Sequence, residues 1–184
     1  VLILQASGTN RDVDVAEAFK LAGANPQIVH INQLKTGEKR WNCYQILVIA
    51  GGFSYADALG AGKLLSIDLT RYFLDEVRTF INSGKPVIGI CNGFQTLVKS
   101  GLIFENGHEQ KIANGTLTFN QQGHFECRWV NLSPVSKKCI WLNNDMNNIE
   151  APVAHGEGYF LSASNHDIEN IIVNDMIALR YAKK

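Results

Sequence analysis

One cysteine of the chain stands where a nucleophile would be held. Cys91 follows the apolar run Val87-Ile88-Gly89-Ile90, and glycines occupy the positions two residues before and after it, Gly89 and Gly93. A nucleophile elbow has this spacing, because a side chain at the top of a tight strand-to-helix turn leaves no room for bulk at the flanking positions. We therefore predict that Cys91 is a nucleophile at a helix N-terminus, where main-chain N–H groups favour the thiolate.

A cysteine that attacks a carbonyl group also needs hydrogen-bond donors for the oxyanion that forms. In elbow enzymes one donor is the main-chain N–H after the nucleophile, and another comes from a glycine loop on a neighbouring strand. Asn92 follows Cys91, and Gly51-Gly52-Phe53-Ser54 follows an apolar run that ends at Ala50. We predict that the N–H groups of Gly52 and Asn92 form an oxyanion site at the carboxyl end of a sheet.

The remaining cysteines, Cys43, Cys127 and Cys139, have no comparable setting, and we assign them a packing role. The cysteine spacing is not that of a zinc site, so no metal is expected. Since no secretory leader or long apolar run occurs, we expect a soluble cytoplasmic protein with reduced thiols.

The size and charge of the chain narrow the choice of partners. Its 184 residues suit one domain, residues 1–184, with a single active site. Lys+Arg and Asp+Glu both number 17, and no basic stripe interrupts the sequence. Nucleic acid and membrane surfaces are therefore poor partner candidates, and small molecules or other proteins are better ones.

The order of apolar and amphipathic stretches predicts the fold class. The first half alternates short apolar runs with helical patterns, as in βαβ units that feed a parallel sheet. We expect buried strands at residues 1–4, 26–31, 45–50 and 87–90, a helix at 12–22 and one helix at 64–81. Beyond about Gly101 the shorter runs suggest antiparallel strands added to this core. The predicted architecture is an open, mostly parallel α/β sheet flanked by helices.

Several motifs of the chain match one known family when they are taken together. They are Gly8-Thr9-Asn10-Arg11-Asp12, Gly51 to Asp57, Gly60-Ala61-Gly62-Lys63, Gly89 to Gln95 and Ala154 to Gly158. These segments resemble the GTN/GSN, GGFSYGD, GAGK, G-x-CNGFQ and AHGEG motifs of class I (triad) glutamine amidotransferases. The resemblance is greatest to the glutaminase subunits of phosphoribosylformylglycinamidine synthase, and it implies a flavodoxin-like sheet.

The resemblance also implies a reaction and its partners. Cys91 would attack the side-chain amide of L-glutamine and form a glutamyl thioester, and ammonia would be released before water yields glutamate. The ammonia would pass to a synthetase subunit, which uses ATP and Mg²⁺ and works with a small accessory subunit in purine biosynthesis. The glutamine site would include Gly51, Phe53, Gln95, Gly156 and Glu157, and this subunit would need no cofactor.

The sequence departs from the family pattern in two places that matter. Ala56 replaces a glycine of GGFSYGD, and a residue other than glycine is strained there if the turn requires a positive φ. The family's triad histidine and glutamate lie in a later H-P-E motif, which does not occur before Lys184, so we expect the usual base to be missing from these residues. His155 and Glu157 have H-x-E spacing and are the second candidates for base and orienting carboxylate.

Two other hypotheses remain open at this point. A DJ-1/PfpI-type cysteine hydrolase also carries a cysteine on an elbow, but Gln95 and the Gly51–Ser54 loop favour glutamine as substrate. A truncated, non-catalytic amidotransferase that only binds the synthetase is the other alternative. Release of glutamate by the protein would exclude the binding subunit.

Overall fold

The computed structural model describes residues 1–105, 112–143 and 146–182 of the chain. These residues fall into two compact units, one within residues 1–110 and the other within 111–184. The family motifs around Cys91 belong to the first unit, and the segment Ala154 to Gly158 belongs to the second. The expectation of one domain over residues 1–184 stays a prediction.

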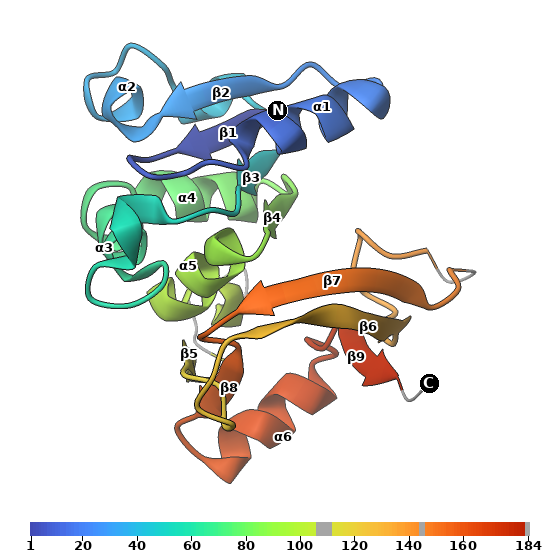
Figure 1. Ribbon diagram of the computed structural model, residues 1–184. Coiled ribbons are helices and arrows are strands. Elements are labelled where there is room, and N and C mark those ends of the chain that lie inside the picture. The colour runs from blue at the N-terminus through green and yellow to red at the C-terminus, as the bar shows by residue number, and fades with distance from the viewer. Residues whose placement is uncertain (106–111, 144–145, 183–184) are drawn as a thin grey trace. The chain divides into compact units, whose positions relative to one another are not determined.

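The first unit is built on a parallel sheet with the strand order β2-β1-β3-β4. Its strands are β1 (Leu2–Gln5), β2 (Gln27–His30), β3 (Leu47–Ile49) and β4 (Val87–Gly89). Its helices are α1 (Asp12–Leu21), α2 (Ile31–Lys35), α3 (Lys63–Tyr72), α4 (Leu74–Asn82) and α5 (Asn92–Ser100). Short 3₁₀ segments cover Trp41–Cys43, Ser54–Asp57 and Leu102–Phe104. The predicted open parallel sheet with flanking helices is confirmed (Figure 1).

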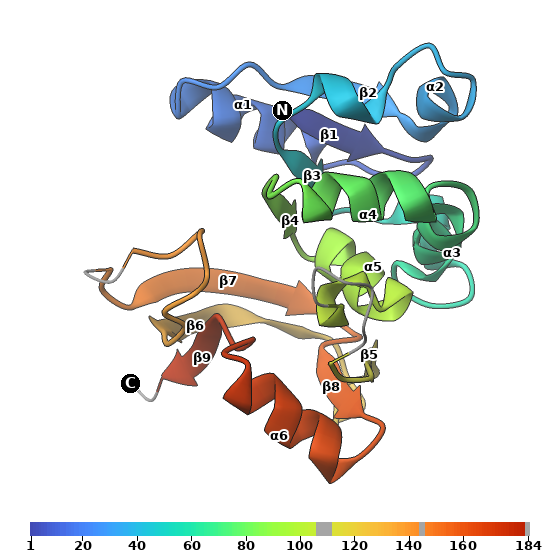
Figure 2. The same cartoon turned by 180° about the vertical axis from the view of Figure 1, so that it is seen from behind.

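The central strands β1 and β3 are mainly apolar because helices cover both faces of the sheet. Leu2, Leu4 and Leu47 point to one face, where they pack with residues of α3, α4 and α5. Ile3 and Val48 point to the other face and pack with α1. Figures 1 and 2, seen from opposite sides, show α1 and α4 on opposite faces. Burial on both faces is the reason that these strands read as continuous apolar runs.

The predicted helix over residues 64–81 is wrong in one respect, because the chain forms two helices that meet at Phe73. Phe73 has φ −136° and ψ 18°, a non-helical conformation, and it is both the C-cap of α3 and the N-cap of α4. Phe73 is 4% exposed, and the centroid of its ring lies 5.4 Å from that of the Trp41 ring. The side chain of Phe73 is buried in the same core cluster as residues of both helices. The apolar periodicity therefore continues across the break, and the sequence pattern does not reveal it.

The second unit contains antiparallel strands and one helix. Its elements are β5 (Gly115–Thr118), β6 (Glu126–Pro134), β7 (Ile149–His155), β8 (Tyr159–Ser162), α6 (Asn165–Val173) and β9 (Leu179–Ala182). The antiparallel pairing is confirmed, but these strands form sheets of their own, β5-β8 and β7-β6-β9, instead of extending the parallel sheet. Strand pairing depends on residues far apart in sequence, which an apolar run by itself does not specify.

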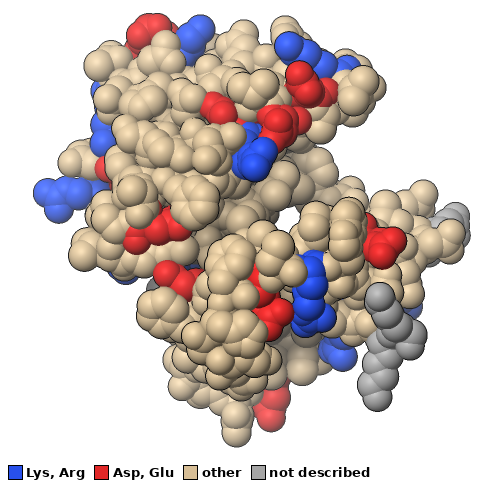
Figure 3. All heavy atoms as spheres, in the orientation of Figure 1, with Lys and Arg blue, Asp and Glu red and all other residues tan. Residues whose placement is uncertain are grey.

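The described ranges contain neither a candidate membrane span nor a cluster of metal-binding side chains. There, no helix is both long and apolar enough to span a bilayer. The same ranges hold no group of three or more His, Cys, Asp or Glu side chains placed to bind a metal ion. On the face shown in Figure 3, acidic and basic side chains are interspersed, as the balanced charge of the sequence suggests.

Candidate active site

The loops that follow β1, β3 and β4 all begin at the carboxyl ends of the parallel strands. Ligands of open α/β sheets bind outside these strand ends. The loop after β1 and the loop after β3 are joined by an antiparallel bridge between Thr9 and Gly52. The N–H of Phe53 donates a hydrogen bond of 3.2 Å to the carbonyl oxygen of Gly8. The structure therefore brings the family's first two motifs together.

Cys91 lies two residues after the end of β4 and directly precedes the first residue of α5. Its backbone has φ 51° and ψ −111°, a conformation that residues other than glycine rarely adopt, and the residue is exposed. Such a conformation costs about 1–3 kcal/mol and persists only where the surroundings enforce it. The predicted strand, sharp turn and helix are confirmed, and the role of Cys91 as the nucleophile stays a prediction.

The glycines on either side of Cys91 are there because backbone passes close to them. A Cβ atom on Gly89 would lie 2.6 Å from the carbonyl oxygen of Gly93. One on Gly93 would overlap the carbonyl oxygen of Ile49 in β3. The N–H of Gly93 donates to the carbonyl oxygen of Ile90 at 2.9 Å, which closes the turn. These contacts are the physical reason for the G-x-C-x-G spacing.

The predicted oxyanion donors lie on the two loops that flank Cys91. A Cβ on Gly51 would be 3.3 Å from Cβ of Cys91, so the β3 loop passes beside the cysteine. Gly52 has φ +127°, and a Cβ there would be 2.6 Å from the main-chain nitrogen of Asn10. Within the described part of the chain, the N–H groups of Gly52 and Asn92 have no hydrogen-bond acceptor. Both groups are therefore available as donors, and their role in binding an oxyanion stays a prediction.

Two residues predicted to contact glutamine differ in their exposure. Phe53 is 56% exposed at the edge of the sheet. Gln95 is only 7% exposed, and its Oε1 accepts a hydrogen bond of 3.4 Å from Nδ2 of Asn92. Gln95 therefore lies beneath the turn, and its glutamine contact stays a prediction.

The turn after the Gly51-Gly52 loop contains a run of residues with positive φ. Tyr55, Ala56, Asp57 and Leu59 have φ values between 52° and 64°. Burial raises the pKa of the Tyr55 phenol, and the hydrogen bond that its hydroxyl donates to Asp68 raises it further. The expectation that Ala56 is strained is confirmed, since its φ is 54° and its ψ is 27°.

We expect the substitution Ala56→Gly to raise the free energy of unfolding by about 1 kcal/mol, because glycine adopts this conformation without a clash of Cβ. Ala58→Gly is the matched control, since Ala58 has φ −54° and ψ 134° and should lose about 0.5–1 kcal/mol on the same change. Chemical denaturation of both variants measures the difference. Equal destabilisation by the two changes would contradict the inferred strain.

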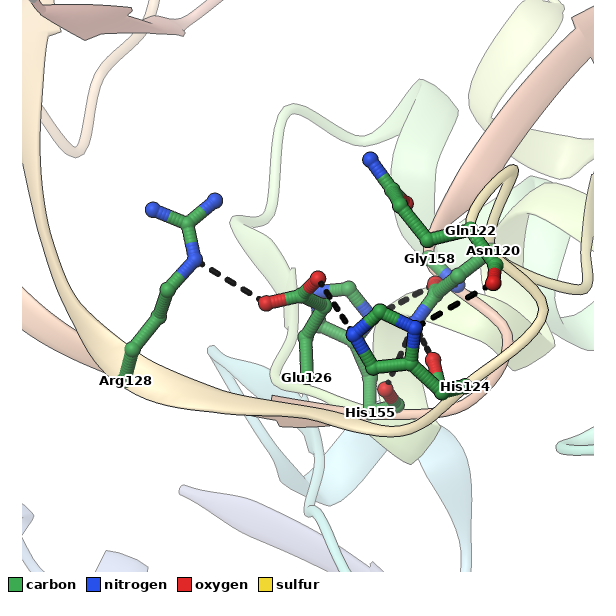
Figure 4. A network of polar contacts seen from close by, with 7 residues as sticks. All are labelled: Asn120, Gln122, His124, Glu126, Arg128, His155 and Gly158. Atoms are coloured by element: carbon green, nitrogen blue, oxygen red, sulfur yellow. Dashed lines mark hydrogen bonds and ion pairs between the residues drawn. The ribbon is translucent and has the colours of Figure 1, made fainter.

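In the second unit, the side chain of Asn120 organises the segment Ala154 to Gly158 (Figure 4). Asn120 is 7% exposed, and its Nδ2 donates to the carbonyl oxygens of His124 and His155, both at 2.9 Å. Its Oδ1 lies 2.9 Å from the N–H of Gly158 and 3.0 Å from Nδ1 of His155. Its main-chain N–H donates to the carbonyl oxygen of Gly156 at 2.9 Å. Nothing in the sequence pattern singles out this asparagine.

These contacts determine the tautomer of His155. Because carbonyl oxygens only accept hydrogen bonds, Nδ2 of Asn120 must face them, and Oδ1 must face the imidazole. Nδ1 of His155 therefore carries the proton, which leaves Nε2 as the acceptor of the neutral ring. Among the other histidines, His30 caps α2, His124 contacts the Gln122 carbonyl, and His108 lies outside the described residues.

Comparison with known proteins identifies the family. The model of the CobB/CobQ-like glutamine amidotransferase domain matches residues 1–184. The phosphoribosylformylglycinamidine synthase subunit PurQ of Treponema denticola is 53% identical over 192 residues, which cover 100% of this chain and 71% of that protein. The chain belongs to the PurQ family of glutamine amidotransferases. The resemblance inferred from the motifs is confirmed.

Other PurQ relatives and a solved structure agree with this family. PurQ of Dehalococcoides mccartyi is 41% identical over 88% of this chain and 63% of its own length. The structure of PurLQS from Thermotoga maritima matches with a TM-score of 0.75 and 26% identity, over 100% of this chain and 74% of that chain. The chain thus spans between about three fifths and three quarters of these PurQ-related proteins. PurQ membership favours an amidotransferase over a DJ-1/PfpI-type hydrolase.

Proposed function

We propose that this chain carries the glutaminase active site of a phosphoribosylformylglycinamidine synthase and that Cys91 is its nucleophile. The observation that carries the proposal is the strained Cys91 at the start of α5, beside two N–H groups that have no acceptor among the described residues. An exposed thiol held between a strand and a helix N-terminus suits attack on an amide carbonyl.

The proposed reaction has two stages. The Cys91 thiolate attacks the side-chain carbonyl carbon of glutamine, and the N–H groups of Gly52 and Asn92 stabilise the oxyanion that forms. Collapse of this intermediate breaks the C–N bond, and the leaving nitrogen takes up a proton as ammonia. Water then attacks the thioester and releases glutamate, which restores the thiol.

In the first unit, we propose that Gly51, Phe53 and Gln95 bind glutamine. Gly156 and Glu157 belong to the Ala154–Gly158 segment of the second unit, and their role in glutamine recognition stays an expectation of the family resemblance. We propose that His155 shapes the Ala154–Gly158 segment and is not the triad base, because the family resemblance assigns the base to a separate His-Pro-Glu motif. The hydrogen bond from His155 to Asn120 supports a structural role.

We expect His155→Asn to keep kcat for glutamine within about threefold of the unmodified protein, because an amide N–H can still donate to Asn120. A general base would instead contribute about 10²–10⁴-fold. Glutamate release by the complete protein measures the difference. A loss of 100-fold or more, with the protein still folded, would make His155 the base and Asn120 its orienting group, as in Cys-His-Asn enzymes.

The partners proposed for this chain follow from the same assignment. They are a synthetase subunit, which binds ATP and Mg²⁺ and accepts the ammonia, and a small accessory subunit, all in the cytoplasm. This chain would need no cofactor of its own, since thioester chemistry requires only the nucleophile, its base and the oxyanion donors.

The experiment that tests the proposed function measures glutamate and amidine together. The complete protein is mixed with the synthetase and accessory subunits, ATP, Mg²⁺, formylglycinamide ribonucleotide and glutamine. We expect equal amounts of glutamate and amidine to form, and ammonium salts should replace glutamine in a control reaction. Amidine formation from ammonium salts but never from glutamine would contradict the proposal and support a subunit that only binds.

A further inference from the structure

The side chain of Asn92 is buried although its neighbour Cys91 is exposed. Asn92 is 2% exposed, and its amide is enclosed by three polar side chains of the first unit. Its Oδ1 accepts from the hydroxyl of Ser54 at 2.5 Å and from the N–H of Ser54 at 3.3 Å. Its Nδ2 donates to Oδ1 of Asp57 at 2.7 Å and to Oε1 of Gln95 at 3.4 Å. A hydrophobic side chain at this position would remove all four of these hydrogen bonds.

The orientation of the Asn92 amide is determined by its partners. The main-chain N–H of Ser54 can only donate, so it requires the amide oxygen. The carboxylate of Asp57 can only accept, so it requires the NH₂ group. The amide oxygen therefore faces a donor and the NH₂ group faces an acceptor, so rotation of the amide by half a turn would break both hydrogen bonds.

These contacts join the two loops that carry the proposed oxyanion donors. Ser54 is two residues after Gly52, and the main-chain N–H of Asn92 is the other donor. Asp57 belongs to the strained turn, with φ 52°, and such a turn persists only when its surroundings hold it. The Asn92 side chain thus connects the elbow to both ends of the turn over Ser54–Asp57.

We propose that the Asn92 side chain, with Ser54 and Asp57, is a positioning element that fixes the spacing of the Gly52 and Asn92 N–H groups. This inference rests on the proposed function and adds residues to it, since Ser54 and Asp57 do not contact the thiol in this role. Loss of the contacts leaves Cys91 on its elbow but lets the Gly52 loop move relative to it. Turnover of glutamine should then fall through kcat, because the oxyanion forms after substrate has bound.

The first test exchanges the donor and the acceptor of the hydrogen bond between Asn92 and Asp57. Asn92→Asp places two carboxylates together and should lower kcat for glutamine about 10²–10³-fold, the effect of losing one oxyanion donor. Asp57→Asn should have a smaller effect, because its amide oxygen can still accept from Asn92. The double variant Asn92→Asp/Asp57→Asn restores a donor and an acceptor, and its kcat should return to within about tenfold of the unmodified protein.

The second test distinguishes an effect on the oxyanion donors from an effect on the reactivity of the Cys91 thiol. Alkylation of Cys91 by iodoacetamide displaces iodide and forms no tetrahedral oxyanion, so it reports only on the thiolate. Ser54→Ala should lower kcat for glutamine about tenfold, with KM changed less than twofold and the alkylation rate within about twofold. Thermal unfolding confirms that each variant is folded.

The outcomes distinguish this inference from the proposed function. A double variant as inactive as Asn92→Asp, or equal losses of turnover and alkylation in Ser54→Ala, would overturn the positioning role while the unmodified protein remains a glutaminase. A complete unmodified protein that releases no glutamate in the assembled complex would overturn the proposed function, and this inference with it.

Discussion

Replacement of Cys91 by serine should abolish glutamine-dependent turnover, with kcat reduced on the order of 10³-fold or more. A hydroxyl group is a much weaker acid and a weaker nucleophile than a thiol, so serine is a poor replacement in this attack. The substitution removes no packing, since Cys91 is exposed. Steady-state glutamate release by the complete protein is the measurement.

The matched control for this prediction is Cys43→Ser, because Cys43 is also exposed and lies in the first unit. Its turnover should equal that of the unmodified protein. Amidine synthesis from ammonium salts by the assembled complex should also survive Cys91→Ser, because ammonia then bypasses this chain. A Cys91→Ser variant that still hydrolyses glutamine at more than about a tenth of the normal rate would exclude Cys91 as the nucleophile.

Gly93→Ala should have the largest effect on stability. Its Cβ would overlap the carbonyl oxygen of Ile49 and lie 3.0 Å from that of Ala50, and both are backbone atoms of the region around β3. Neither a side-chain rotation nor a small shift relieves such an overlap, so the substitution must displace α5 from the sheet. We expect a loss of about 3 kcal/mol or more in the free energy of unfolding.

Gly84→Ala is the control for this steric argument. Gly84 has φ +75°, and a Cβ there meets nothing within 4 Å, so only backbone strain of about 1–2 kcal/mol applies. Chemical denaturation compares the two variants, and glutaminase activity shows whether the elbow survives. A Gly93→Ala protein as stable as Gly84→Ala would show that α5 does not need this close approach.

The elbow could be predicted from the sequence because its requirements are local. The positions of Gly89 and Gly93 relative to Cys91 are dictated by contacts within one turn and the adjacent strand, and they appear in the sequence as a fixed spacing. The strain at Ala56 could be expected for the same reason, since one substitution in a turn motif requires a conformation that only glycine adopts readily.

The helix break at Phe73 and the hydrogen bonds of Asn92 and Asn120 could not be predicted, because they depend on contacts that the sequence pattern does not indicate. Phe73 continues the apolar periodicity while its backbone ends one helix and begins another. The roles of Ser54 and Asp57 arise from hydrogen bonds to Asn92 across more than thirty residues, 38 and 35 positions away. Asn120 likewise organises a segment 35 residues further along. Short polar side chains in loops give no pattern from which such partners can be inferred.

The most direct test of the account is covalent labelling of the complete protein with a glutamine-mimicking electrophile, followed by intact-mass measurement and peptide mapping. The account predicts one added label per chain, located on Cys91, and no label on the Cys91→Ser variant. Excess glutamine should slow the labelling, because both compete for the same site. A label on Cys43, Cys127 or Cys139, or the absence of any label, would contradict the assignment of Cys91 as the nucleophile.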